Sequence, residues 1–307
     1  MGQFVDGEWK TGWYKSGEDG SFQRPPTTFR ESISALDEGR YHLYVSWACP
    51  WAHRTLIARS VLGLEEKISV SYVDWLLDDD GWRFFPEHEG SSEDHLFGFD
   101  RLRHVYKKAD DKYTGRVTVP ILWDRKSERI LNNESREVLR QFTTVLRPWH
   151  AEGAPDLCPE ELKSEIDATL DAIYEPINNG VYKSGFANSQ EAYDKAVETL
   201  FAALDSWEKH LDGTNFLVGG RFTEADICMF TTLLRFDPVY HTHFKCSLRM
   251  LAEYPNLDRY LKRVYHQPGV ASTCNLEHIT KHYFVSHRHI NPTGIVARTP
   301  RAFSLGD

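Results

Sequence analysis

The sequence lacks the features that would assign it to several broad classes of protein. Its 307 residues carry a net charge of −9, so it has no basic excess with which to bind the phosphates of a nucleic acid. No apolar run approaches the ~20 residues of a membrane-spanning helix, and no short-period repeat or low-complexity tract occurs. We therefore expect a globular protein that binds neither nucleic acid nor a membrane.

Targeting signals and a disulfide framework are also missing. The first twenty residues contain neither the apolar core of a secretory signal nor the Arg-rich amphipathic pattern of a transit peptide. Asp6 stands where N-myristoylation needs Ser or Thr. The five cysteines, an odd number without framework spacing, favour reduced thiols. These absences predict a cytoplasmic protein.

The first half of the chain has the pattern of a small α/β domain. Residues 1–39, rich in Gly, Ser, Pro and aromatic residues, are expected to be an irregular N-terminal extension. Over residues 40–147, the patterns predict strands at 41–47, 67–75, 116–124 and 128–132 and helices at 50–62, 101–112 and 134–146. This order suits a mixed sheet with helices on its faces. An insert at about 74–112 is too long for an ordinary connection and is expected to be functional.

The second half, residues 148–307, is predicted to be an all-helical domain with a C-terminal tail. A proline-rich linker leads into it, and apolar residues then recur at the spacing of one buried helix face, at Leu162, Ile166, Leu170 and Ile173. Thr223 and Asp226 have the spacing of a capping box, in which each side chain bonds to the backbone N–H of the other residue. The segments 161–177, 191–211, 221–237 and 256–269 are all predicted to be helical.

Cys49 is the cysteine whose surroundings would activate a thiol. It stands between a predicted strand and a predicted helix, where unpaired N–H groups and the positive end of the helix dipole favour a thiolate. Pro50 suits the first helical position, and His53 and Arg54 add donors. The alternative, a small buried cysteine that fills a gap, is our interpretation of Cys158, Cys228, Cys246 and Cys274.

Two further segments could complete a site for a sulfur-containing peptide. In VTVP, a cis bond between Val119 and Pro120 would turn the backbone of Val119 towards Cys49, where it can pair with a peptide. An ordinary edge proline is the alternative. In NNES, the Ser135 hydroxyl and adjacent N–H groups could hold a carboxylate, and Glu134 could pair with an ammonium. Simple helix capping is the alternative there.

Together these segments resemble the thioredoxin-like domain of glutathione transferases and the helical domain that follows it. ACPWAHRTL at 48–56 is similar to the Cys-Pro-Trp-Ala signature of the Xi class, the glutathionyl-hydroquinone reductases. Other similar segments lie within about residues 40–296: GRVTVPILWD, NNES, NNGVYKSGFA, EAYD, TEADI, RFDPVYHTHFKC, YPNL and HYFVSHRHINPTG. The implied fold is a thioredoxin-like α/β domain followed by an all-α, glutathione-transferase-like domain.

The resemblance implies which residues bind glutathione. Val119, beside cis-Pro120, would pair with the cysteinyl backbone of the tripeptide, and Glu134 and Ser135 would hold its γ-glutamyl end. Two more residues would approach the tripeptide from the insert and from the strand: Trp82 and Arg116.

The resemblance also implies the catalytic residues. Cys49 would be the nucleophile, and Tyr182, Tyr240 and Tyr283 would converge over its thiol as the acceptor site. Phenol O–H groups suit this place because they can stabilise the oxyanion that develops when a hydroquinone leaves sulfur. The histidines near residues 241–243 and 278–289 are expected to make polar contacts or lie at the surface, without a metal.

The implied activity is the deglutathionylation of glutathionyl-hydroquinones, with glutathione as cosubstrate and no metal. The partners would be glutathionylated aromatic or quinone compounds and a second copy of the chain in a homodimer. One alternative is an omega-like thioltransferase or dehydroascorbate reductase, which would share Cys49 but not need the tyrosines. Another is a ligand-binding protein that sequesters aromatic compounds.

Overall fold

The computed structural model describes residues 1–14 and 16–306, which form two compact units. Unit 1 consists of Met1–Trp13, Pro26–Ala154 and Thr273–Arg288. Unit 2 consists of Tyr14–Pro25, Pro155–Ser272 and His289–Asp307. Among the described residues, no helix is both long enough and apolar enough to cross a lipid bilayer.

The centre of unit 1 is a four-stranded mixed sheet in the order β4-β3-β8-β9. The first two strands are parallel, as a βαβ crossover requires, and the later pairs are antiparallel. Every residue of the two central strands, β3 and β8, is buried, so these strands form the core of the sheet. The strands span Tyr41–Val45 (β3), Ile68–Tyr72 (β4), Ile121–Asp124 (β8) and Arg129–Asn132 (β9). The predicted order of elements is confirmed.

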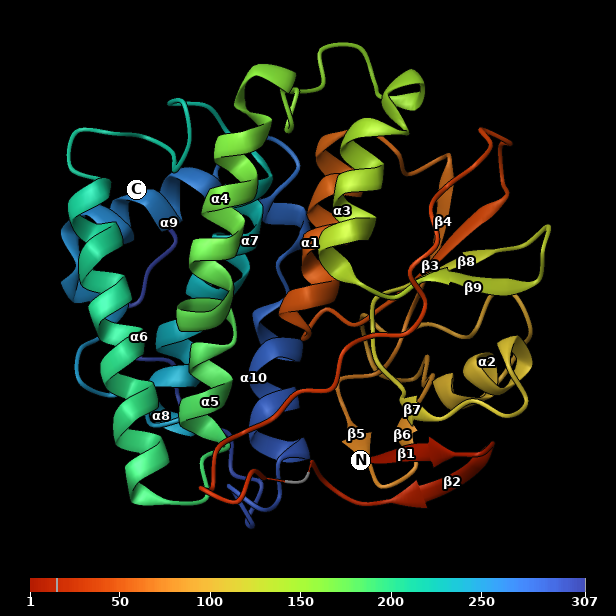
Figure 1. The fold of residues 1–307 in the computed structure, drawn as a ribbon, viewed down its shortest axis with the longest axis horizontal. Helices are drawn as coiled ribbons and strands as arrows, with labels where there is room; N and C mark the ends of the chain where they lie inside the picture. The colour runs from red at the N-terminus through yellow and green to blue at the C-terminus, as the bar shows by residue number, and fades with distance from the viewer. Residues whose placement is uncertain (15, 307) are drawn as a thin grey trace. The chain divides into compact units, whose positions relative to one another are not determined.

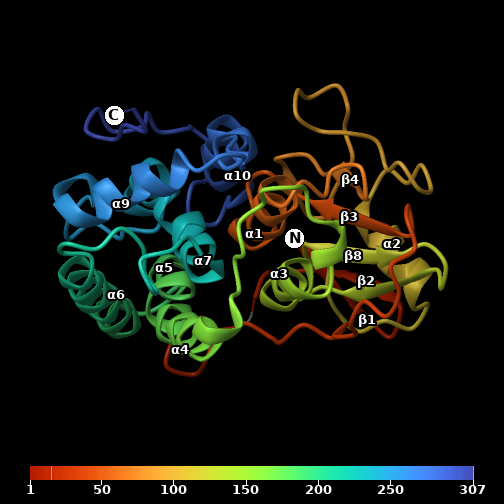
Figure 2. The same ribbon diagram turned by 90° about the horizontal axis from the view of Figure 1, so that it is seen from above.

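Helices α1 and α3 pack side by side, and α2 contacts β6 and β9 away from them (Figures 1 and 2). Their bounds are Pro50–Val61 (α1), Leu102–Ala109 (α2) and Ser135–Thr144 (α3), followed by a 3₁₀ turn at Arg147–Trp149 (η1). Gly63 follows the C-cap residue of α1, Leu62, and its φ is +67°. A Cβ atom at this position would lie 2.5 Å from Cβ of Ala151. Glycine is therefore the residue that both the backbone and the space at this helix end require.

Residues 2–11 form a hairpin where the sequence analysis expects irregular structure. Strands β1 (Gly2–Val5) and β2 (Glu8–Thr11) pair antiparallel, and β1 also pairs with β7 (Gly115–Arg116). The connecting residues Asp6 and Gly7 have φ of 49° and 79°. An Asp-Gly pair with two positive φ angles suits a two-residue hairpin turn. The sequence VDGE at residues 5–8 therefore carries a hairpin signal.

The strand predicted over 116–124 is divided. β7 ends at Arg116 and β8 begins at Ile121, directly after Pro120. Proline has no N–H to donate to a sheet ladder, so pairing begins only beyond it. The separation leaves residues 117–120 as a connection rather than a strand.

The insert folds within unit 1 around a short pair of strands, β5 (Leu77–Asp78) and β6 (Gly81–Trp82). Helix α10 (Leu276–Ser286) also belongs to unit 1 and contacts β5. The helix lies within residues 148–307, which the sequence predicts to be the all-helical domain. It packs in unit 1 because polar side chains along one of its faces bond to the backbone of the insert, as described below.

Unit 2 is built from helices, as predicted. Its elements are η2 (Glu160–Leu162), α4 (Lys163–Ile173), α5 (Gly180–Gly185), α6 (Gln190–His210), α7 (Glu224–Leu233), α8 (His241–His243), η5 (Leu251–Glu253) and α9 (Pro255–Tyr265), with η6 (Ala271–Thr273) at its boundary. Ile166, Leu170 and Ile173 are buried on α4. The predicted capping box at the start of α7 is confirmed, with the Thr223 N–H donating to the Asp226 carboxylate at 2.8 Å.

Two π-helical turns interrupt the helices of unit 2, at Tyr174–Asn178 (η3) and Phe236–Tyr240 (η4). In each, a backbone N–H bonds to the carbonyl five residues earlier, Asn179 to Tyr174 and Tyr240 to Arg235. Both turns contain a proline, Pro176 or Pro238, which lacks the N–H for regular helical bonding. Such turns often mark functional sites. η3 ends four residues before the predicted Tyr182, and η4 contains the predicted Tyr240.

Candidate active site

The thiol of Cys49 lies at the N-terminus of α1. Cys49 is the N-cap residue, Pro50 follows as the first helical residue, and the first turn contains no acidic side chain. Its thiol donates to the carbonyl oxygen of Val119 across 3.6 Å. The Val119–Pro120 peptide bond is cis. The structure thus brings together the thiol and the VTVP backbone, the first two of the predicted components.

Glu134 and Ser135 lie at the start of α3. Glu134 is the N-cap, and its carboxylate accepts from the N–H of Arg136 at 3.4 Å and from the hydroxyl of Thr27 at 3.1 Å. The Ser135 hydroxyl accepts from the guanidinium of Arg54 at 3.3 Å. Glu134 therefore caps α3. Both contacts are made by neutral donors and leave the carboxylate its negative charge, so capping does not oppose a role in binding an ammonium, and that role stays a prediction.

Arg116 and Trp82 are held by other parts of unit 1. The Arg116 guanidinium donates to the carbonyls of Gly2, Gly12 and Trp13 at 3.2, 2.8 and 2.6 Å, so it anchors the N-terminal hairpin. Trp82 pairs with Leu77 in the short sheet and is 5% exposed. Little of its surface can therefore meet a ligand. No pattern in the sequence indicates these structural contacts, and the approach of both residues to glutathione stays a prediction.

Tyr182 and Tyr240 belong to one aromatic cluster in unit 2. Their ring centroids are 6.1 Å apart, and the ring of Phe244 stacks on Tyr240 at 5.3 Å with 3° between the planes. Phe186 packs edge-on against Phe244 at 5.0 Å. Tyr240 is fully buried. The cluster thus holds two of the three predicted tyrosines close together.

Tyr283 belongs to unit 1, with Cys49. It lies in α10, is 1% exposed, and packs edge-on against the rings of His282 and His287 at 5.1 and 5.4 Å. The predicted convergence of Tyr283 with the two tyrosines of unit 2 over the thiol stays a prediction.

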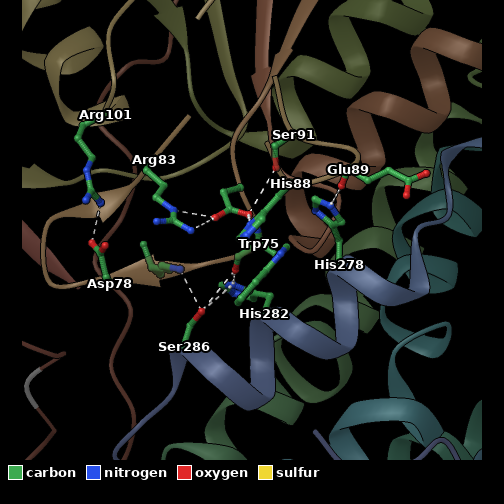
Figure 3. A network of polar contacts seen from close by, with 12 residues as sticks. Trp75, Asp78, Arg83, His88, Glu89, Ser91, Arg101, His278, His282 and Ser286 are labelled. Atoms are coloured by element: carbon green, nitrogen blue, oxygen red, sulfur yellow. Dashed lines mark hydrogen bonds and ion pairs between the residues drawn. The ribbon is translucent and has the colours of Figure 1, made fainter. Parts of the chain in front are cut away.

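A network of polar contacts joins α10 to the insert (Figure 3). His278 bonds to the carbonyl of Glu89 at 2.6 Å, and His282 bonds to that of Trp75 at 2.8 Å. The N–H of Leu77 donates to the Ser286 hydroxyl at 3.0 Å. These histidines make polar contacts, as expected, but they are buried rather than at the surface.

Two residues near Cys49 have roles that the sequence analysis missed. The indole of Trp47 stacks on Tyr72 at 4.4 Å and donates to the carbonyl of Gly90 at 2.8 Å, which ties the tip of the insert to the segment before the thiol. Cys274 lies 3.9 Å from the ring of His53, one turn into α1. For the contacts of Trp47, the only signal in the sequence is the length of the insert. Nothing in the sequence indicated the second.

No group of three or more His, Cys, Asp and Glu side chains within residues 1–14 and 16–306 could hold a metal ion.

Comparisons with known proteins place this geometry in one family. The model for the glutathione S-transferase N-terminal domain matches residues 48–144, and the model for the glutathione S-transferase C-terminal domain matches residues 190–263. The Xi-class glutathione transferase of Natrialba magadii is 47% identical, with a TM-score of 0.93, and the match covers 100% of this chain and 95% of that one.

Two relatives extend the match. Glutathionyl-hydroquinone reductase YqjG of Escherichia coli is 46% identical over 98% of this chain and 95% of its own length, and its glutathione-bound structure superposes with a TM-score of 0.88. The match with that structure covers 99% of this chain and 97% of the chain in that structure. Glutathionyl-hydroquinone reductase PcpF of Sphingobium chlorophenolicum is 48% identical over 98% of this chain and 96% of its own length. The chain belongs to the Xi class of glutathione transferases, and the predicted fold class, thioredoxin-like followed by all-α, is confirmed.

Proposed function

We propose that the protein is a glutathione-dependent reductase that removes glutathione from glutathionyl-hydroquinones through Cys49. The observation that carries this proposal is a thiol at the N-terminus of α1 that lies 3.6 Å from the carbonyl of Val119. The helix terminus favours the thiolate, and the adjacent backbone can pair with a peptide that carries sulfur. Two relatives named glutathionyl-hydroquinone reductases, 46% and 48% identical over nearly the whole chain, support the same activity.

In the first half-reaction, the Cys49 thiolate attacks the sulfur of the glutathionyl thioether. The new bond is a disulfide between Cys49 and glutathione, and the bond that breaks joins sulfur to the ring carbon. Carbon is a poor leaving group unless the hydroquinone first tautomerises to a ketone. The tautomer already carries a proton on the ring carbon that bears sulfur. The electron pair therefore leaves as an enolate, which is the hydroquinone anion, and protonation of its oxygen gives the hydroquinone.

Phenol hydroxyls suit the developing enolate oxygen. A donor placed where negative charge appears stabilises the transition state more than the ground state. Tyr182 and Tyr240 form one cluster at 6.1 Å, and Tyr283 lies in the unit that carries the thiol. We assign the three hydroxyls to the oxyanion as part of the proposal.

In the second half-reaction, a second glutathione thiolate attacks the mixed disulfide. Oxidised glutathione leaves and the Cys49 thiolate is restored. Over the cycle the substrate carbon is reduced, while its thioether sulfur and the thiol of one free glutathione are oxidised to the disulfide of oxidised glutathione. Glutathione is thus the resolving thiol, which is why one activated cysteine is sufficient. Glu134 and Ser135 would hold its γ-glutamyl end, Val119 its cysteinyl backbone, and Trp82 and Arg116 would lie along it.

The state of the cysteines also bears on the compartment in which the protein works. Five cysteines without a disulfide among them suit a reducing compartment, and we propose a cytoplasmic enzyme. We also propose a homodimer, as the family resemblance implies.

The test is intact mass spectrometry after incubation with glutathionyl-menadione in its reduced form. We expect release of the hydroquinone and one glutathione adduct, on Cys49, that a second glutathione removes. Turnover of a glutathionylated peptide at an equal or higher kcat/KM would instead favour a thioltransferase. Stoichiometric binding of the aromatic compound without release of hydroquinone would favour a ligand-binding protein.

A further inference from the structure

The face of α10 that anchors it in unit 1 is a regular polar stripe. His278, His282 and Ser286 are spaced by four residues and therefore lie on one side of the helix over two turns. All three bond to backbone groups of the insert, at Glu89, Trp75 and Leu77 (Figure 3). Three contacts thus fix the rotation of the helix about its axis and its position along that axis. Because Tyr283 belongs to the same helix, they also fix its place.

The insert can hold α10 in place because several of its side chains bond to one buried carboxylate. Asp74 is fully buried and accepts from the Arg83 guanidinium at 2.7 Å, from the His88 ring at 3.0 Å and from the Ser91 hydroxyl at 3.4 Å. A buried carboxylate with several partners holds its loops together strongly, because the loss of any partner leaves charge without compensation. The carbonyl of Trp75 follows directly after this residue.

His282 makes two different contacts with the insert. A carbonyl oxygen can only accept, so Nδ1 of His282 carries the hydrogen that is donated to Trp75 at 2.8 Å. The face of the same ring stacks on Trp82, with the centroids 4.9 Å apart and 19° between the planes. One side chain therefore fixes both the helix and the tryptophan.

We propose that His282 is a positioning residue that couples the two halves of the active site. Its hydrogen bond sets the place of Tyr283 on the acceptor side, and its stacking sets the plane of Trp82 on the glutathione side. The inference rests on the proposed function, because it assigns His282 an effect on the two residues that act there. It also explains why a helix close to the end of the chain folds against an insert some 200 positions earlier.

Two substitutions separate the two contacts. His282→Phe keeps a ring that can stack on Trp82 but removes the donor to Trp75. His282→Asn places an amide N–H near the position of Nδ1 but removes the ring. Thr280→Ala, on the same helix, is the matched control, since the Thr280 hydroxyl bonds to the carbonyl of Leu276 within α10.

The expected results are opposite for the two variants. In His282→Phe, kcat for the glutathionyl-hydroquinone should fall about 10²-fold because a misplaced donor loses most of its effect, while the KM for glutathione is unchanged. In His282→Asn, the KM for glutathione should rise about 3- to 10-fold because the aromatic contact is lost, while kcat is unchanged. Amide hydrogen exchange over residues 276–286 should accelerate in His282→Phe alone.

The outcomes are decisive in each direction. Equal changes of kcat and KM in both variants, or an unchanged exchange rate of α10 in His282→Phe, would show that His282 only supports the fold. An inactive wild-type protein would overturn the proposed function together with this inference. An active wild type whose His282 variants do not divide kcat from KM would overturn this inference alone.

Discussion

The sulfur of Cys49 and the carbonyl oxygen of Val119 are 3.6 Å apart, although 70 positions separate the two residues in the chain. A peptide that pairs with the Val119 backbone would bring its own cysteinyl sulfur next to this thiol. The arrangement is suited to forming and breaking a mixed disulfide.

Replacing Cys49 with alanine should abolish deglutathionylation, because Cys49 is the described cysteine that occupies the N-cap position of a helix. The measurement is hydroquinone release from a glutathionyl-hydroquinone by liquid chromatography. Cys274→Ser is the control, since Cys274 is the other partly exposed cysteine, and it should retain activity. Substantial turnover by Cys49→Ala would contradict the assignment of the nucleophile.

Glu134 offers a test that separates ligand binding from helix capping. Glu134→Gln keeps an oxygen that can accept from the Arg136 N–H but removes the charge, so the KM for glutathione should rise about 10- to 100-fold as a charge-assisted bond is lost. Glu134→Ala should show the same rise and also lose about 1 kcal/mol of unfolding free energy with the cap. Alkylation of Cys49 by iodoacetamide should be unaffected in both. Slowed alkylation would mean that Glu134 supports the thiol loop instead of the ligand.

The tyrosines should distinguish a carbon leaving group from a sulfur leaving group. Phenylalanine at position 182, 240 or 283 removes a donor from the proposed oxyanion, which should lower kcat for a glutathionyl-hydroquinone by about 10²-fold. A glutathione mixed disulfide expels a thiolate that needs no such donor, so its turnover should change little. Steady-state kinetics with both substrates on each variant provide the comparison. Equal losses of turnover on both substrates would show that the hydroxyls only shape the pocket.

The buried histidine of β3 should make the fold sensitive to acid. Burial lowers the pKa of His42 to about 3, while its unfolded pKa is near 6.5. The folded state therefore binds fewer protons, so this stability is present above pH 6.5 and is lost as the pH falls towards 3. Between pH 7 and pH 5 the loss should be about 2 kcal/mol.

Urea unfolding at the two pH values measures this loss. His42→Gln cannot ionise, so its unfolding free energy should fall by about 2 kcal/mol less than that of the wild type over the same interval. Both ring nitrogens of His42 contact serine hydroxyls, at 2.7 and 3.0 Å, so a neutral polar substitute keeps partners. Parallel losses in the two proteins would assign the acid sensitivity to other groups.

Local signals were sufficient for several elements of both units. The position of Cys49 between β3 and α1, the proline at the first helical position and the capping box of α7 each depend on a few neighbouring residues. Patterns of that range can be read without knowing what packs against them. The alternating and periodic segments likewise predicted the order of strands and helices.

Contacts between distant segments could not be read in this way. The hold of Arg116 on the carbonyls of residues 2–13 and the bonds between α10 and the insert join parts of the chain about 100 and 200 positions apart. The donors are ordinary polar residues, and their acceptors are backbone carbonyls, which every residue has. No residue type marks a carbonyl as a partner, so such contacts appear only in the folded molecule.

The membership of α10 in unit 1 limits how members of this family can be recombined. Unit 1 is closed by Thr273–Arg288, which follow the whole of Pro155–Ser272 in the chain. A chimera with a single junction near residue 154 would combine one parent's insert with the other parent's α10, and the polar stripe would meet a backbone shaped for a different partner. A functional exchange of the helical unit should need a second junction near residue 272, so that α10 is inherited with the insert that supports it.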